Sequence, residues 1–142
     1  MIFLRDPSPY HGGGNKRPFF EGWYHKLVTG DGQSLAIIPG IYRSGFNNNQ
    51  TAFIMIFDGD KGNVFYEQFE VQQFSCSTSS YSLHIGSNYF SSEKIILDIE
   101  SETLTIKGQV TADNLKPWPV TLFEPGCMGW YAYVPTMECF HG

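Results

Sequence analysis

Short stretches rich in β-branched and aromatic residues recur along the chain, separated by turn-forming residues at intervals of about 8 to 12 positions. In the clearest stretch, Ile95, Leu97 and Ile99 alternate with polar neighbours, as in a strand with one buried and one solvated face. Gly, Asn and Asp, which tolerate positive φ, fill segments 29–32, 44–49 and 58–63 and indicate hairpin turns. No helical period of useful length is present. The pattern therefore predicts an all-β fold, an antiparallel sandwich, barrel or half-barrel of about eight strands. The strands are expected at residues 19–28, 34–42, 51–57, 64–71, 81–90, 94–99, 104–110 and 120–123.

One expected strand has no polar face. Residues 52–57 read AFIMIF and are apolar on both parities, so a strand there is expected to be buried on both sides. Its outer face then needs a cover, and a second domain, a partner subunit and a lipid surface are the candidates.

The composition describes a folded, aromatic-rich domain. The 142 residues suit one domain, aromatic residues make up 16%, and the formal net charge is -5. No stretch gathers Lys and Arg on one face, so nucleic acid is not an expected partner.

The chain also lacks the sequence features of export. No apolar run approaches the roughly 20 residues of a spanning helix, and Arg5 and Asp6 follow the first four residues at once, unlike a signal peptide. The odd number of cysteines, Cys76, Cys127 and Cys139, without CxxC spacing, favours reduced thiols over a disulfide framework. We therefore expect a cytoplasmic protein.

The first segment with candidate chemistry is residues 19–26, FFEGWYHK. The period of a strand places Glu21, Trp23 and His25 on one face. A carboxylic acid among rings can serve as a general acid near neutral pH, because desolvation raises its pKa. The alternative is a structural role, with Glu21 in an ion pair with Lys26 or Arg43 or hydrogen-bonded to an aromatic residue.

The second candidate segment is residues 123–142, which is dense in Gly, Pro, Met and rings. Glu138 is its strongest ionisable candidate, with the hydroxyls of Tyr131 and Tyr133 as possible partners. The segment is expected either to line an apolar pocket or to close one end of a barrel, and core packing with an ionic latch is the alternative.

Two further motifs are weak. The string HGGG at residues 11–14 matches an esterase oxyanion loop, but no GxSxG nucleophile elbow accompanies it, so we interpret it as a flexible loop. Cys139 and His141 share a strand face and could bind zinc with Cys127, yet no second close pair of ligands supports a metal site.

Three strings together resemble the tocopherol cyclase family: FFEGWYHKLV at residues 19–28, IPGI at 38–41 and PGCMGWYAYVPTMECFHG at 125–142. The resemblance implies two lipocalin-like β-domains related to the carotenoid hydratase group. Because members of the family are much longer, residues 1–142 are expected to be a single β-domain, the first of those two. The missing half, or another copy of this chain, would then cover the strand at 52–57.

The family resemblance implies an isomerase of vitamin E biosynthesis that cyclises a prenylated hydroquinone to a chromanol. That reaction needs an acid, a dry aromatic pocket and no cofactor or metal, because substrate and product are isomers. An isoprenoid hydratase and a non-catalytic lipid- or isoprenoid-binding domain are the alternatives. The expected partner is an apolar prenyl quinol or other isoprenoid, with peripheral membrane contact and either homo-oligomer formation or a C-terminal domain. The candidate catalytic residues are Glu21, Glu138 and His141, and the candidate substrate-binding residues are Trp23, Tyr24, His25, Trp130, Tyr131 and Tyr133.

Overall fold

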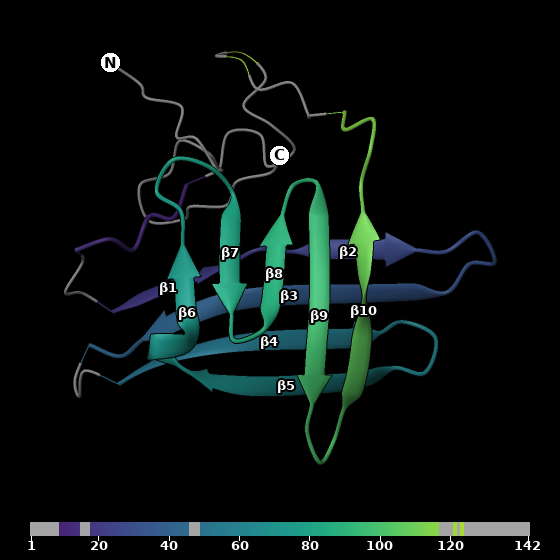
Figure 1. Cartoon of the computed structure of the whole chain (residues 1–142), viewed down its shortest axis with the longest axis horizontal. Helices are drawn as coiled ribbons and strands as arrows, with labels where there is room; N and C mark the ends of the chain where they lie inside the picture. The colour runs from purple at the N-terminus through teal and green to yellow at the C-terminus, as the bar shows by residue number, and fades with distance from the viewer. Residues whose placement is uncertain (1–8, 15–17, 46–48, 117–120, 122, 124–142) are drawn as a thin grey trace.

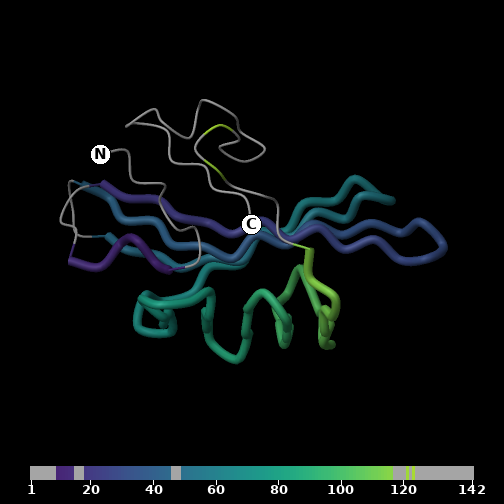
Figure 2. Tube along the Cα trace, turned by 90° about the horizontal axis from the view of Figure 1, so that it is seen from above, coloured from purple at the N-terminus to yellow at the C-terminus, as the bar shows by residue number. Residues whose placement is uncertain are grey.

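The chain folds into two antiparallel β-sheets that lie face to face, with the strands of one sheet running across those of the other (Figures 1 and 2). The computed structural model describes residues 9–14, 18–45, 49–116, 121 and 123. Within these residues each sheet has five strands, and the two form an open crossed sandwich rather than a closed barrel. The all-β prediction is confirmed. Among the described residues, no helix is long and apolar enough to span a membrane.

The first sheet, sheet A, has the strand order β1-β3-β4-β5, and β2 also pairs with β3. Its expected turns lie where glycine and polar residues predicted them, with Gly32 (φ 92°) before β3 and Gly62 (φ 70°) before β5. These positive φ values favour glycine because it carries no Cβ. The strands are β1 (Phe19–Gly22), β2 (His25–Val28), β3 (Ser34–Arg43), β4 (Gln50–Asp58) and β5 (Asn63–Glu70).

The stretch 19–28, expected as one strand, is divided into β1 and β2 although its register against β3 does not change. At the division the N–H of Trp23 donates to the carbonyl of Pro39 at 2.9 Å. Proline has no N–H to return a second hydrogen bond, so the ladder is interrupted at that pair. The inward and outward alternation of side chains therefore continues through the break.

The second sheet, sheet B, has the strand order β10-β9-β8-β7-β6. The chain enters it through the 3-10 turn η1, where the backbone N–H of Glu70 donates to Oε1 of Gln73 at 3.2 Å within a capping box. The elements are η1 (Val71–Gln73), β6 (Phe74–Cys76), β7 (Ser82–Ile85), β8 (Asn88–Ser91), β9 (Lys94–Glu100) and β10 (Thr105–Thr111).

Sheet B corrects one strand prediction. The single strand expected at residues 81–90 is a hairpin, in which Ile85 pairs with Asn88 across a turn at Gly86, whose φ is 59°. Glycine accepts this backbone conformation, which favours a two-residue reversal over a continuous strand. The short strand β6 was not expected. The strand expected at 120–123 lies largely outside the described residues, and neither Thr121 nor Phe123 is in a strand.

The core lies between the sheets. The alternation predicted for residues 94–99 is confirmed, because Ile95, Leu97 and Ile99 are buried while Asp98 is exposed. Burying such side chains is the main favourable term in folding. The core cluster consists of Ile37, Ala52, Ile54 and Ile56 from sheet A and Leu83, Ile85, Phe90, Ile95, Leu97 and Ile99 from sheet B.

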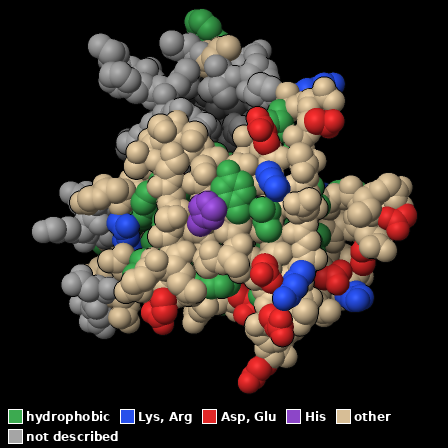
Figure 3. Space-filling view, viewed as in Figure 1, with side chains coloured by type: hydrophobic (Ala, Val, Ile, Leu, Met, Phe, Trp, Pro, Cys, Tyr) green, Lys and Arg blue, Asp and Glu red, His purple; other side chains and the backbone are tan. Residues whose placement is uncertain are grey.

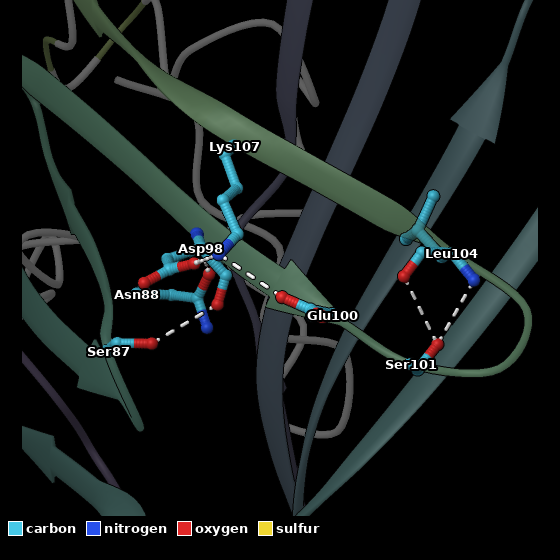
Figure 4. A network of polar contacts seen from close by, with 7 residues as sticks. All are labelled: Ser87, Asn88, Asp98, Glu100, Ser101, Leu104 and Lys107. Atoms are coloured by element: carbon cyan, nitrogen blue, oxygen red, sulfur yellow. Dashed lines mark hydrogen bonds and ion pairs between the residues drawn. The ribbon is translucent and has the colours of Figure 1, made fainter.

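A polar network joins the hairpin β7–β8 to β9 (Figure 4). The buried side chain of Asn88 donates from Nδ2 to the carbonyl of Ile85 at 2.9 Å and accepts from the N–H of Asp98 at 2.8 Å. On the solvent side, Nζ of Lys107 lies 3.2 Å from carboxylate oxygens of both Asp98 and Glu100. The buried amide of Asn88 is thus hydrogen-bonded through both its nitrogen and its oxygen, and it links the hairpin to β9.

The prediction that residues 52–57 are buried on both faces holds in part. Ala52, Ile54 and Ile56 face the core and are at most 1% exposed, and Phe53 on the outer face is 2% exposed. Met55, also on the outer face, is only partly buried. On the outer face of β4, Phe53 is therefore buried, whereas the neighbouring Met55 is partly accessible to solvent.

Candidate functional site

Glu21, Trp23 and His25 lie on the inner face of sheet A, as the alternation predicted. Their partners on β3 include Ile41 opposite Glu21 and Ile37 opposite His25, both of which are fully buried. The three side chains therefore form a row along one edge of the sandwich, facing sheet B.

Glu21 is held by His11. Oε1 of the carboxylate lies 2.8 Å from Nδ1 of His11, and Oε2 accepts the backbone N–H of the same residue at 3.1 Å. The side chain of Glu21 is 14% exposed and that of His11 is 24% exposed, so the pair is close to solvent on one side. Lys26, one of the partners considered from the sequence, lies on the opposite face of the sheet. The structure thus provides a carboxylate and an imidazole within proton-transfer distance.

Residues 9–12, here called the strap, cross the inner side of sheet A. Nη2 of Arg43 donates to Oη of Tyr10 at 2.7 Å, and Nη1 of Arg43 donates to the carbonyl of Gly12. The N–H of Tyr10 donates to the carbonyl of Ser77, just beyond β6, at 3.2 Å. A Cβ at Gly12 would lie 2.3 Å from Oη of Tyr10, so no larger residue fits there without movement. The strap therefore ties both sheets together beside Glu21.

Aromatic rings continue from the strap into the sandwich. The Tyr10 ring lies 5.4 Å from that of Phe74 and 6.4 Å from that of Trp23, between ring centroids. Trp23 in turn stacks on Tyr81 with centroids 5.7 Å apart. Burial is the main cause that raises the pKa of the Tyr10 hydroxyl, which keeps it protonated at neutral pH. The acid and its imidazole partner thus lie at one end of an aromatic wall.

His25 lies deeper along the same row. Its ring stacks between Tyr81 and Phe90, at centroid distances of 5.6 and 5.9 Å, and its Nε2 lies 2.5 Å from Oη of Tyr81. Burial lowers the pKa of His25 to about 4 and raises the pKa of Tyr81 above its usual value. At neutral pH the Tyr81 hydroxyl therefore donates to a neutral imidazole, which is a weak base.

Cys76 lies near the same end of the sandwich. It is a free thiol, as predicted, and burial raises its pKa to about 11, so it is unreactive at neutral pH. Within the described residues, no group of three or more metal-ligating side chains comes together. Cys127, Cys139 and His141, considered for zinc, lie outside the described residues.

The structure separates Tyr24 from the other predicted residues. Its side chain is on the outer face of sheet A and is 63% exposed, whereas Trp23 and His25 face the core. The remaining predicted site residues, Trp130, Tyr131, Tyr133, Glu138 and His141, lie outside the described residues.

Sequence reasoning missed three members of this site, His11, Tyr10 and Tyr81. His11 was assigned to a flexible loop, and no local pattern points to Glu21 ten residues later. Tyr81 shares its parity with Leu83 and Ile85, which marks it as inward-facing, but that pattern does not reveal its contact with His25.

Comparison with known proteins adds no relative: no family model, curated protein or solved structure matches this chain. The chemistry of the site therefore has to be judged from its geometry, which combines a carboxylate–imidazole pair, an arginine-bound tyrosine and stacked aromatic rings.

Proposed function

We propose that this chain carries the acid and the aromatic wall of a tocopherol cyclase-like isomerase, which closes a prenylated hydroquinone to a chromanol. The observation that carries the proposal is the Glu21–His11 pair, 2.8 Å apart at the end of the ring cluster that begins with Tyr10 and Trp23. The similarity of residues 19–28, 38–41 and 125–142 to that family supplies the substrate class.

The proton balance of the reaction suits this pair. The step starts from the form of the pair in which Glu21 carries a proton. Glu21 gives this proton to the alkene, which creates a tertiary cation, and the phenol oxygen attacks that cation to form the new C–O bond. The phenol proton then passes through His11 to the Glu21 carboxylate, which restores the acid. One proton enters and one leaves, so the isomerisation needs no cofactor.

The rings beside the acid suit the cation. Trp23 and Tyr10 offer the negative faces of their π-systems, and Trp is the strongest cation-stabilising side chain. The reaction also requires that the bound substrate keep water away from the cation, because water would trap it as an alcohol. Of the two histidines in the site, His25 is a poor base because burial lowers its pKa to about 4, so His11 accepts the phenol proton in the proposal.

The proposal extends to the parent architecture. The two crossed sheets correspond to part of a lipocalin-like barrel, and residues 1–142 to the first of two such domains. Prenyl quinols dissolve in bilayers, so a cytoplasmic protein would meet its substrate by peripheral contact with a membrane surface.

The experiment is to incubate the chain with a reduced methyl-hydroquinone that carries a geranylgeranyl chain, and to separate the products by liquid chromatography with mass detection. Cyclisation gives a product of unchanged mass with a chromanol absorbance spectrum. Glu21→Gln is expected to lower turnover by about 100-fold or more, with substrate affinity retained, because a positioned acid contributes about 10²–10⁴-fold.

The matched control is Glu67→Gln. Glu67 faces the same side of sheet A but accepts hydrogen bonds from Ser101 at 2.8 Å and Thr103 at 3.0 Å at the far edge, so turnover should not change. Glu138→Gln tests the other candidate acid. A product one water heavier would assign the hydratase alternative, and binding without conversion would assign the isoprenoid-binding alternative. Either result refutes the cyclase proposal.

A further inference from the structure

The outer face of sheet A is strongly apolar. Phe20, Phe53 and Tyr66 form a stacked row across it, with ring centroids 5.7 and 5.5 Å apart. Phe53 is 2% exposed within this row, but the rings that flank it are open, Phe20 at 65% and Tyr66 at 47%. Four more apolar side chains of this face are exposed by 48% to 63%, namely Tyr24, Val28, Tyr42 and Val64.

Two glycines of this face lie beneath the row of rings. Gly40 pairs with Phe53 and Gly22 pairs with Gly40, so two neighbouring strands carry no side chain at that level. The Phe53 ring lies over Gly40, where a Cβ would come within 2.4 Å of its Cζ. The glycines thus leave room for the rings of Phe20 and Phe53 to lie close to the sheet.

The two outer faces of the sandwich differ in charge. The face of sheet B carries acidic and basic side chains, among them Asp98, Glu100 and Lys107 (Figure 3). On the strands of sheet A, the outward positions carry only two charges, Lys26 and Glu70, and both side chains are exposed. Such a face suits a protein partner with a similar apolar surface.

The positions of these two charges are informative. The register places Lys26 in the row of Ala36, Phe57 and Val64, at one edge of the sheet. Glu70 lies on β5, the opposite edge strand. Along the strand direction it is three outward-facing positions away from the level of Lys26. The two charges therefore occupy diagonally opposite corners of the apolar face. Two copies can pack face to face about a two-fold axis that lies in the plane of the interface, along the diagonal that joins the other two corners. Lys26 of each copy then lies over the partner's Glu70.

The outer face of sheet A is about as large as a dimer interface requires. It is four strands wide, and each strand places every second side chain outward, at up to five levels along the strands. With standard strand spacing and rise, the face measures about 19 by 33 Å, or roughly 600 Å² in projection. Exposed rings make the accessible area larger than this projection. A standard dimer buries about 800 Å² on each partner.

From these observations we infer that the outer face of sheet A is a homodimer interface, in which two copies pack their Phe20–Phe53–Tyr66 rows together and pair Lys26 with Glu70 at two corners. The interface is on the opposite side of sheet A from Glu21 and His11, so it is independent of the proposed reaction.

The first test is sedimentation velocity of the full chain from 1 to 200 µM. We expect a reversible monomer–dimer equilibrium within this range. Phe20→Ser removes an exposed ring of the row and should weaken the dimer by about tenfold or more, because a few buried aromatic residues carry much of the binding energy at interfaces. Tyr89→Ser is the matched control, because Tyr89 is an aromatic residue on the outer face of sheet B, where it pairs with His84.

The second test is a double-mutant cycle on the charges. Lys26→Glu should weaken the dimer several-fold, because symmetry changes two attractive contacts into two repulsive ones. In the background of Glu70→Gln, which retains an oxygen for the cap of η1, the same change should have a markedly smaller effect. Lys61→Glu, in the exposed β4–β5 turn, is the control for net charge.

Circular dichroism of each variant establishes that it is folded. A wild-type chain that stays monomeric at 200 µM overturns the inference and leaves the face to a different partner, such as a further domain. A dimer that is equally sensitive to Tyr89→Ser and Phe20→Ser, or that shows no coupling between Lys26 and Glu70, also overturns it.

Discussion

The buried imidazole of His25 should make the stability of the fold depend on pH. Burial between Tyr81 and Phe90 lowers its pKa to about 4, against 6.5 for an exposed histidine. Between these values the unfolded chain binds the proton and the folded chain does not. The unfolding free energy contributed by His25 is therefore fully present above pH 6.5 and is lost as the pH falls towards 4.

The magnitude follows from the two pKa values. Each unit of difference corresponds to about 1.4 kcal/mol, so the loss relative to pH 7 is about 2 kcal/mol at pH 5 and about 3 kcal/mol at pH 4. This is a large part of the roughly 5–15 kcal/mol that stabilises an ordinary domain. Carboxylates also titrate at the acidic end of this range, so the contribution of His25 has to be taken as a difference between two variants.

The assay is urea unfolding at several pH values between 4 and 7.5, followed by tryptophan fluorescence. The test variant is His25→Phe with Tyr81→Phe, which keeps two stacked rings and removes both polar partners, so no buried hydroxyl is left unsatisfied. The wild type should lose about 3 kcal/mol more than this variant between pH 7 and pH 4. Parallel pH profiles of the two proteins would refute the reasoning, as would a His25 pKa near 6.5 in an NMR titration of the folded chain.

Two further predictions concern packing and thiol reactivity. Gly40→Ala should lower the unfolding free energy by about 1–3 kcal/mol in thermal or urea unfolding, because its Cβ would lie 2.4 Å from Cζ of Phe53 and 2.7 Å from the backbone oxygen of Glu21. Gly108→Ala, where nothing lies within 4 Å of the added Cβ, is the control, and an equal loss in both variants would contradict the role given to Phe53. Cys76 should react with iodoacetamide at pH 8 far more slowly than a free thiol peptide, because its pKa is raised to about 11. Peptide mapping by mass spectrometry measures that rate, and labelling of Cys76 as fast as the peptide would contradict it.

Much of the fold could be predicted because it depends on local patterns. A period of two decides which side chains share a face, so the inward row of Glu21, Trp23 and His25 followed from their spacing alone. Glycines at positive φ marked turns at Gly32 and Gly62 in the same way. The hairpin at Gly86 was missed although Gly86-Ser87 is a dipeptide typical of two-residue turns, because each flanking strand is only four residues long and the stretch was taken as one strand.

The functional contacts were decided by the tertiary structure. Glu21 is paired with His11 rather than Lys26, because the strap crosses the inner face of sheet A while Lys26 points to the outer face. His25 contacts Tyr81, 56 positions later in the chain, only because sheet B packs across sheet A. The sequence by itself thus determined the strands and the face of each side chain, since these depend on neighbouring residues. The partner and the pKa of each ionisable group depend on segments brought together by packing, so the tertiary structure decided them.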